Sequence, residues 1–308
     1  MTSQTDRQRP TGHQMGPVQR ILLAGAAISL TLTGTATVAH DAVAEGSECK
    51  DVYVVAVPGT NQGAPHSNGR TDAVAAFGEE VATVVKTLTE GLSDKSLKIG
   101  GVNYPALGVD GLQPATAKLA YDISTYKASK DKGYSHAYST VQRWGSNCSQ
   151  TQFVLAGFSQ GAHIAGDLAQ SILHGHGPVD RGRLAAAVLI GDPAYNSTSP
   201  NANEFRYDGP KTEGDDRNQR TLVTDPDHWE IRGSLGERAA FDAKDPVISV
   251  CVYGDPICDA TSVGWNGYNA GAASEKAWMH GLYTHVKYTG GQDLATWAGR
   301  EAASKVSD

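Results

Sequence analysis

The stretch that decides the fold is TQFVLAGFSQGA, residues 151–162. Its first part is a short, mostly apolar run, which predicts a buried strand over 151–156. A serine between two glycines, Gly157-Phe-Ser-Gln-Gly161, follows at once. Beyond it, residues 162–174 carry apolar side chains at four-residue intervals, which predicts a helix. A strand, a tight turn and a helix are therefore expected in direct succession.

Similar elements alternate on both sides of this stretch. Apolar and β-branched runs predict further buried strands at 51–57, 97–104, 184–190 and 247–253. Apolar residues at helical spacing predict helices at 71–88 and 292–303, and one or two more within 117–144. Such alternation is typical of an α/β fold, a three-layer sandwich in which helices cover both faces of a mostly parallel sheet. The stretch 195–245 is rich in Asn, Asp, Pro and Gly, and we interpret it as a long surface excursion.

The amino-terminal segment has the features of a secretory signal peptide. Three arginines precede an apolar run at 21–32: Arg7, Arg9 and Arg20. The sequence Ala42-Val43-Ala44 then supplies an A-x-A exit, with Ala39 as an alternative cleavage point. About a dozen apolar residues are too few for a membrane-spanning helix, which needs about 20. We expect a cleaved signal rather than an uncleaved anchor.

The remaining chain is expected to be one domain. We assign 1–44 to the signal peptide and 45–308 to a single α/β domain that is secreted or held in the cell envelope, with no transmembrane segment after signal removal. The full chain has a net charge of −7 and no basic stripe, which argues against nucleic acid as a partner. We expect a monomer.

The four cysteines, Cys49, Cys148, Cys251 and Cys258, all lie beyond the signal. An even number in an exported chain favours disulfides, for which three pairings are possible. Cys251 and Cys258 are near enough in sequence to close a short loop, which would leave Cys49 for Cys148. A zinc site is the competing interpretation, but the spacings lack paired C-x-x-C knuckles.

Ser159 is the candidate nucleophile. A bare G-x-S-x-G is a weak motif, but here it follows a strand and opens a helix, as a nucleophile elbow does. A Cβ at either glycine would collide with the neighbouring strand or helix, and N–H groups at the start of the helix would face a developing oxyanion. The alternative is a tight turn with an incidental serine.

A serine nucleophile needs a histidine base, and the base needs a carboxylate that orients it. In enzymes with this elbow, the acid and then the histidine follow the serine along the chain. Asp255 is the preferred acid because it lies just after the last strand, inside the loop between Cys251 and Cys258. Asp192 is the second candidate, although its Gly-Asp-Pro setting suits a turn better.

Two histidines come late enough to be the base, and both lie in an H-x-x-Y pattern. His280 precedes Tyr283, and His285 precedes Tyr288. His285 is nearer the final helix and enters a Thr-Gly-Gly turn, so it is preferred, with His280 as the alternative. His163 lies one helical turn after the serine, where a packed histidine is the more common outcome.

These motifs together resemble the cutinases, with the bacterial cutinase-like branch the nearest match. The residues that carry the resemblance are GFSQGA at 157–162, CVYGDPIC at 251–258, the late H-x-x-Y, VNYPA at 102–106 and the Gly191-Asp-Pro193 strand end. The resemblance covers nearly all of the chain after the signal. It implies a small α/β-hydrolase fold and disulfides Cys49–Cys148 and Cys251–Cys258.

The resemblance also implies the composition of the site. The triad would be Ser159, Asp255 and a late histidine, His285 or His280. The oxyanion hole would combine the Gln160 N–H with Thr60, which matches a family hydroxyl position but could be only a turn residue.

The function implied is that of a secreted serine esterase or lipase. It would hydrolyse cutin-like polyesters, short- to medium-chain acyl esters or lipids through an acyl-enzyme, without a metal or an organic cofactor. Two alternatives remain: an envelope-lipid acyltransferase or thioesterase with the same triad, and a non-catalytic exported binding module. Three aromatic residues after the acid could line an acyl groove or pack on its rim: Trp265, Tyr268 and Trp278.

Overall fold

The computed structural model describes residues 49–69, 71–108, 116–208, 221–224, 231–263, 277–288 and 290–307. All of them belong to the unit Glu48–Asp308, which is separate from the unit Met1–Ser47. The expected signal peptide, 1–44, lies outside the described residues, as do Trp265 and Tyr268.

An eight-stranded sheet forms the centre of this unit, in the order β2-β1-β3-β4-β7-β5-β6-β8. Neighbouring strands run parallel except for the antiparallel pair β5–β6. The strands are β1 Val52–Val57, β2 Leu97–Gly101, β3 Gln152–Phe158, β4 Leu184–Ile190, β5 Ala202–Asp208, β6 Thr221–Thr224, β7 Val247–Tyr253 and β8 Lys287–Tyr288. The mostly parallel sheet predicted from the sequence is confirmed.

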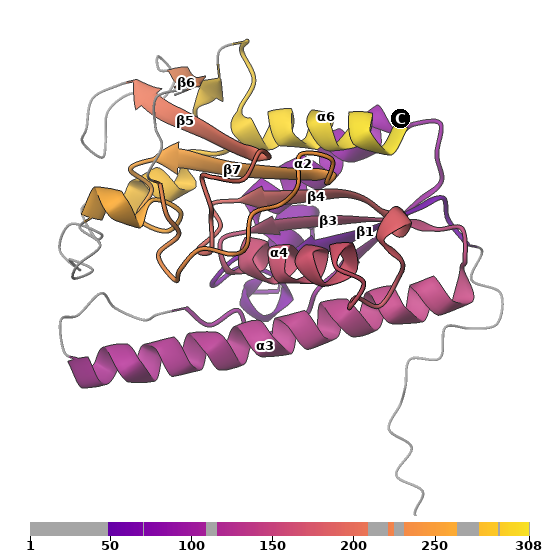
Figure 1. Ribbon diagram of the computed structural model, residues 1–308, viewed down its shortest axis with the longest axis horizontal. Helices are drawn as coiled ribbons and strands as arrows, with labels where there is room; N and C mark the ends of the chain where they lie inside the picture. Colours follow the sequence, from indigo (N-terminus) through magenta and orange to yellow (C-terminus); the bar gives the residue numbers. More distant parts are fainter. Residues whose placement is uncertain are drawn as a thin grey trace, which may run out of the picture. The chain divides into compact units, whose positions relative to one another are not determined.

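Helices cover both faces of the sheet (Figure 1). They are α1 Ala73–Phe77, α2 Glu79–Gly91, α3 Thr116–Asn147, α4 Gln160–Leu173 and α6 Leu294–Ser307. Short 3-10 helices are η1 Ala64–His66, η2 Arg181–Arg183, η4 Ala260–Val263 and η5 Ala277–Gly281. Side chains of α2 and α6 join one apolar cluster with the sheet, whereas those of α3 and α4 join a second cluster on the opposite face. The three-layer α/β architecture is therefore as expected.

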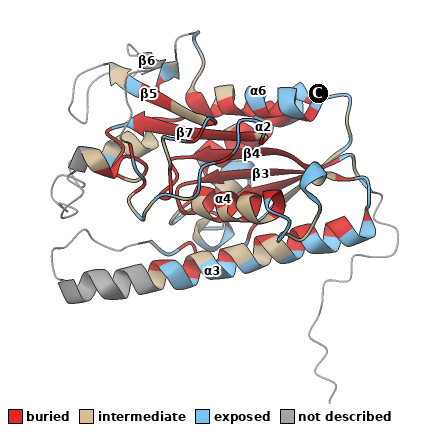
Figure 2. Ribbon diagram, viewed as in Figure 1, coloured by how far each residue is buried: buried red, intermediate tan, exposed pale blue. Residues whose placement is uncertain are grey.

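The central strands are the most deeply buried part of the chain (Figure 2). All seven residues of β4 are buried, as are the last six of β3. Strands covered on both faces are expected to read as continuous apolar runs, and those runs are what identified β1, β3, β4 and β7 in the sequence.

Several elements differ from the sequence prediction in their limits. The helix expected over 71–88 is split into α1 and α2 at Gly78, whose φ of 79° lies in the left-handed region. The stretch 117–144 forms one helix, α3. The second strand ends at Gly101, although Val102 and Tyr104 remain buried.

The interpretation of 195–245 as a surface excursion is wrong in part. This stretch contributes β5 and β6, and β5 pairs with β7 along Ala202–Arg206. Within β5, only Glu204 and Phe205 are buried among the residues whose exposure is described, so the strand has no apolar run to reveal it. Backbone pairing with β7, which a sequence pattern does not show, holds it in the sheet.

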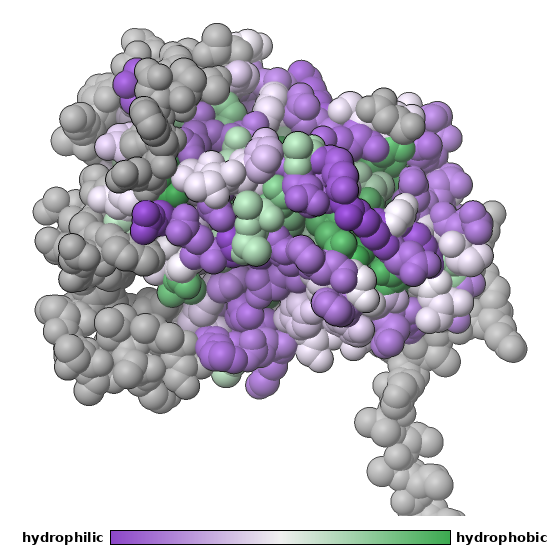
Figure 3. Space-filling view, in the orientation of Figure 1, coloured by the Kyte–Doolittle hydropathy of each residue, from purple (hydrophilic) through white to green (hydrophobic). Residues whose placement is uncertain are grey.

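The outer surface is mainly hydrophilic in the view of Figure 3, with apolar side chains showing as interrupted areas. None of the helices in the described ranges has the length and hydropathy of a membrane span.

Candidate active site

Ser159 lies at the turn between β3 and α4. It is the N-cap of α4 and is buried, with φ 55° and ψ −123°. A positive φ is unfavourable for a residue with a Cβ and costs about 1–3 kcal/mol, so the surrounding structure must enforce it. The Ser159 N–H donates to the Ile190 carbonyl at 2.9 Å, which ties the turn to the end of β4. The sequence thus folds locally as the nucleophile elbow that G-x-S-x-G predicts.

Both flanking glycines are required by close backbone approach. A Cβ at Gly157 would overlap the Gly161 carbonyl, and a Cβ at Gly161 would overlap the Val57 carbonyl at the end of β1. The first turn of α4 therefore packs directly against β1 and β3. Its first N–H groups, which lack intrahelical acceptors, stay beside the serine.

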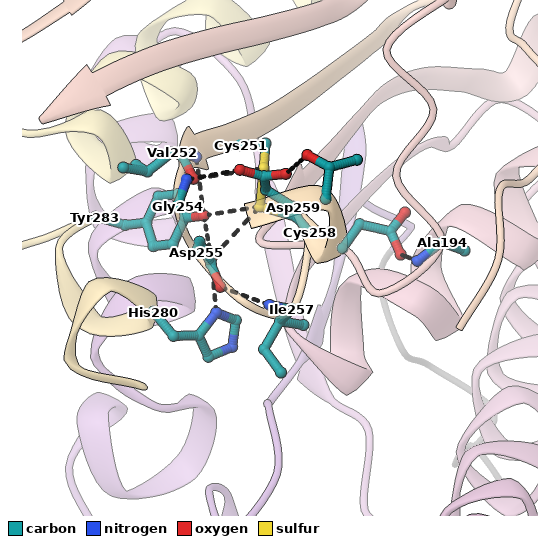
Figure 4. Close-up of a disulfide and its surroundings, with 12 residues drawn as sticks. Ala194, Cys251, Val252, Gly254, Asp255, Ile257, Cys258, Asp259, His280 and Tyr283 are labelled. Atoms are coloured by element: carbon teal, nitrogen blue, oxygen red, sulfur yellow. Dashed lines mark hydrogen bonds and ion pairs between the residues drawn. A yellow bond between two sulfur atoms is a disulfide. The ribbon is translucent and has the colours of Figure 1, made fainter. Parts of the chain in front are cut away.

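Asp255 follows β7 and is fully buried inside the loop closed by Cys251 and Cys258. Figure 4 shows its carboxylate between the disulfide and two side chains, His280 and Tyr283. Its Oδ2 lies 2.8 Å from His280 Nδ1 and 2.6 Å from the Tyr283 hydroxyl. A buried carboxylate needs such donors, because burial without them would be costly.

His280, the alternative base from the sequence, lies between Asp255 and Phe158. Its ring stacks on Phe158, the residue before the serine, with ring centroids 4.6 Å apart. A Cβ on Gly191 would lie only 2.8 Å from His280 Cε1, so the glycine after β4 makes room for the imidazole. Because an ionised carboxylate only accepts, Nδ1 carries the proton and Nε2 has the free lone pair. Within the described part of the chain, Nε2 is buried and has no hydrogen-bond partner.

His285, the base preferred from sequence, lies elsewhere. Its Nε2 is 3.8 Å from Glu79 Oε2, and its side chain is 42% exposed. Leu282, Tyr283 and Val286 enter the apolar core, so the side chain of His285 points to the outside of the same turn. The structure pairs Asp255 with His280, and the preference for His285 is corrected on this ground.

Asp192, the second candidate acid, is engaged in a buried ion pair instead. Its Oδ2 lies 2.7 Å from an Arg238 guanidinium nitrogen, and a second nitrogen of Arg238 lies 2.9 Å from Asp167 Oδ1. Burial lowers the pKa of Arg238, but the charges of Asp192 and Asp167 outweigh it and raise the pKa above its usual value. His163 lies in the same region, where its Nδ1 is 3.0 Å from the Tyr126 hydroxyl and burial lowers its pKa.

The segment that carries Arg238 also supports the acid loop. The Ser234 N–H donates to the Ile257 carbonyl at 2.9 Å, and the Ala260 N–H donates to the Arg232 carbonyl at 2.7 Å. The sequence did not reveal that this segment supports the acid loop or that Arg238 binds two aspartates, because an isolated arginine in a polar stretch has no periodic pattern around it. The segment is part of the site's framework rather than only an excursion.

Gln160, a candidate for the oxyanion hole, is the first residue of α4 and is fully buried. Its side-chain Nε2 donates to the Leu107 carbonyl at 3.0 Å, and its Oε1 accepts from the Ser129 hydroxyl at 3.2 Å. The side chain is therefore used to fix the start of the helix, and the backbone N–H remains as the group suited to an oxyanion.

Thr60, the other candidate, lies in the loop after β1 and is half-buried. Gln62 holds this loop, because it accepts from the Gly59 N–H at 2.9 Å and donates to Glu80 at 3.0 Å. The contact of β1 with Gly161 brings the beginning of the loop to the first turn of α4.

Trp278, the described one of the three aromatic residues after the acid, packs edge-on against Tyr207, which favours a packing role.

Both disulfides expected from the sequence, Cys49–Cys148 and Cys251–Cys258, are present. The first closes a long loop, with 99 residues of separation, and the second a short one, with 7. In the chain-entropy account, a loop of about 100 residues stabilises by about 4.7 kcal/mol and one of about 8 residues by about 2.5 kcal/mol. The second disulfide is thus expected to stabilise the whole fold less than the first, but it closes the loop that contains Asp255.

We expect the double variant Cys251→Ser/Cys258→Ser to lose most of its turnover with only a modest fall in melting temperature. The reason is that the short bridge fixes the acid loop more than it restrains the unfolded chain. Turnover per folded molecule and thermal unfolding would be measured together. A variant that melts much earlier yet keeps full turnover when folded would contradict the expectation.

Comparison with known proteins identifies a family model and several relatives that this chain is similar to. A sequence model of the family described as Cutinase matches residues 48–274. "Carboxylesterase Culp1" of Mycobacterium tuberculosis is 29% identical over 185 residues, which cover 60% of this chain and 71% of that protein. "Phospholipase Culp4" of the same organism is 30% identical over 240 residues, which cover 74% of this chain and 91% of that protein. The solved structure of a cutinase-like protein from Cryptococcus sp. is 18% identical, has a TM-score of 0.49, and covers 84% of this chain and 97% of that one.

Proposed function

This chain belongs to the cutinase family and is a carboxylic ester hydrolase, and we propose that it cleaves esters through an acyl-enzyme on Ser159. The observation that carries the proposal is the pairing of His280 with the buried Asp255 against Phe158. The His280 Nε2 is buried and has no hydrogen-bond partner among the described residues, and the ring stacks on Phe158, which precedes Ser159.

In the proposed mechanism, His280 Nε2 takes the proton of the Ser159 hydroxyl as the oxygen attacks the ester carbonyl. The Gln160 N–H and the Thr60 hydroxyl stabilise the oxyanion of the tetrahedral intermediate. The imidazolium returns its proton to the leaving alkoxide, which departs as an alcohol. Water, deprotonated by His280, then attacks the acyl-enzyme and releases the acid and the free serine. Throughout, the Asp255 carboxylate holds the Nδ1–H and stabilises the charged imidazole.

We propose that the substrates are esters outside the cytoplasm: cutin-like polyesters, short- to medium-chain acyl esters or lipids. The signal-like features at 1–44 and the two disulfides support an oxidising compartment, the exterior or the cell envelope. Relatives named as a carboxylesterase and a phospholipase support acyl esters and lipids as the substrate classes to test.

The test is an activity profile over p-nitrophenyl esters from acetate to palmitate, beside a polyester film and a phospholipid. We expect turnover that is highest on short to medium chains, with free acid as the product. The proposal would be overturned if the enzyme cleaved none of these esters. Adding an alcohol as a competing acceptor separates the alternative, because an acyltransferase would form the new ester in place of the acid.

A further inference from the structure

Tyr283 lies against the candidate acid but has no place in the mechanism above. It is fully buried, and its hydroxyl is 2.6 Å from Asp255 Oδ2, the same oxygen that His280 Nδ1 contacts at 2.8 Å (Figure 4). His280 lies in η5, and Tyr283 follows it by three residues. The H-x-x-Y spacing therefore brings both side chains onto one carboxylate oxygen.

The direction of these hydrogen bonds is fixed by the chemistry of the groups. An ionised carboxylate can only accept, so the phenol donates to Asp255. The phenol oxygen in turn accepts from the Val252 N–H at 3.3 Å. Burial, and then the negative charge of Asp255, raise the pKa of Tyr283 well above its usual value. Tyr283 therefore keeps its proton and stays a donor over the whole range in which an esterase works.

We propose that Tyr283 is a positioning residue for the triad, whose hydroxyl holds the Asp255 carboxylate in the orientation that receives the Nδ1–H of His280. This proposal rests on the proposed function. The carboxylate has few other restraints in the described structure: the Ile257 N–H donates to its Oδ1 at 2.9 Å. The disulfide packs against both partners, with the Cys258 sulfur 3.4 Å from Asp255 Oδ2 and 3.4 Å from the Tyr283 oxygen.

The hydroxyl also stabilises negative charge in this loop by donating a hydrogen bond to it. Asp259, which is buried directly after this loop and whose N–H donates to the Asp255 carbonyl, adds a second carboxyl group. Tyr283 supplies a neutral donor to Asp255 without adding a positive charge. Without it, the carboxylate would lose a neutral hydrogen-bond donor and a restraint on its orientation toward the imidazole.

The test is the substitution Tyr283→Phe, which removes only the hydroxyl. We expect kcat to fall about tenfold with KM within about twofold, because the side chain is fully buried and presents no surface to a bound substrate. We also expect the acid limb of the pH–rate profile to move to higher pH, because a carboxylate that no longer accepts from the phenol interacts more strongly with the imidazolium. Tyr53→Phe is the matched control: it removes the hydroxyl of another buried tyrosine, near the amino end of β1, and should leave kcat and the pH profile unchanged.

A Tyr283→Phe enzyme with the parent kcat and pH profile would overturn the proposal, whatever its melting temperature. If this variant does not fold, replacing Tyr283 by 3,5-difluorotyrosine keeps the shape and makes the phenol a stronger donor. The acid limb should then move to lower pH, and an unmoved limb would overturn the proposal. Ser159→Ala in the same assay separates the two proposals, because ester cleavage that persists there would refute the proposed function rather than the role of Tyr283.

Discussion

Replacing Ser159 by alanine is expected to lower ester hydrolysis by about 10³-fold or more while leaving the protein folded. In the proposed mechanism the serine hydroxyl forms the acyl-enzyme, and no other residue of Gly157-Phe-Ser-Gln-Gly161 carries a nucleophile. Alanine keeps the Cβ and the backbone N–H that donates to Ile190, so the turn and its strain should persist. Turnover on a p-nitrophenyl ester and thermal unfolding would be measured on the same preparation.

A fluorophosphonate probe gives an independent measurement. It should label the parent and fail to label Ser159→Ala. Ser171→Ala, a substitution of the same kind further along α4, is the control and should be labelled like the parent. Labelling of Ser159→Ala at the parental rate would assign the nucleophile to another residue.

His280→Ala is also expected to cost about 10³-fold or more in turnover, because the serine proton then has no acceptor. His285→Ala should cost less than about tenfold, since that side chain is 42% exposed and faces Glu79. Each variant replaces a histidine of one H-x-x-Y motif, and the two motifs follow each other closely in the sequence, so each variant is the other's control. Both would be compared by kcat at saturating substrate.

The opposite ranking would transfer the role of base to His285 and would require a rearrangement of the acid loop. Near-equal, mild losses in both would contradict the triad itself. In either case the assignment of Ser159 as the nucleophile would be tested independently, because fluorophosphonate labelling compares the parent with Ser159→Ala and does not ask which histidine is the base.

The central elements were predictable because they are buried on both faces. The strands β1, β3, β4 and β7 and the helix α4 leave apolar runs or apolar spacing in the sequence. Two features were not predictable from the sequence. The split at Gly78 depends on a single backbone angle, and the strand β5 depends on its pairing with β7. Arg238 was missed for a similar reason: its partners, Asp192 and Asp167, come from distant parts of the chain.

The sequence by itself determined the strand–turn–helix around Ser159, because its glycines meet requirements that are local: backbone contacts and a sharp turn within a few residues. It also placed Asp255 inside a short disulfide loop, since seven residues of separation leave little choice of partner. Both His280 and His285 satisfy H-x-x-Y, so the sequence preferred His285 only for its place before the final helix. Only the tertiary structure decided which imidazole faces Asp255: burial of Leu282, Tyr283 and Val286 in the core turns His285 outward and leaves His280 over Phe158. A side chain's direction at that turn depends on what the whole segment packs against, and that information is not local.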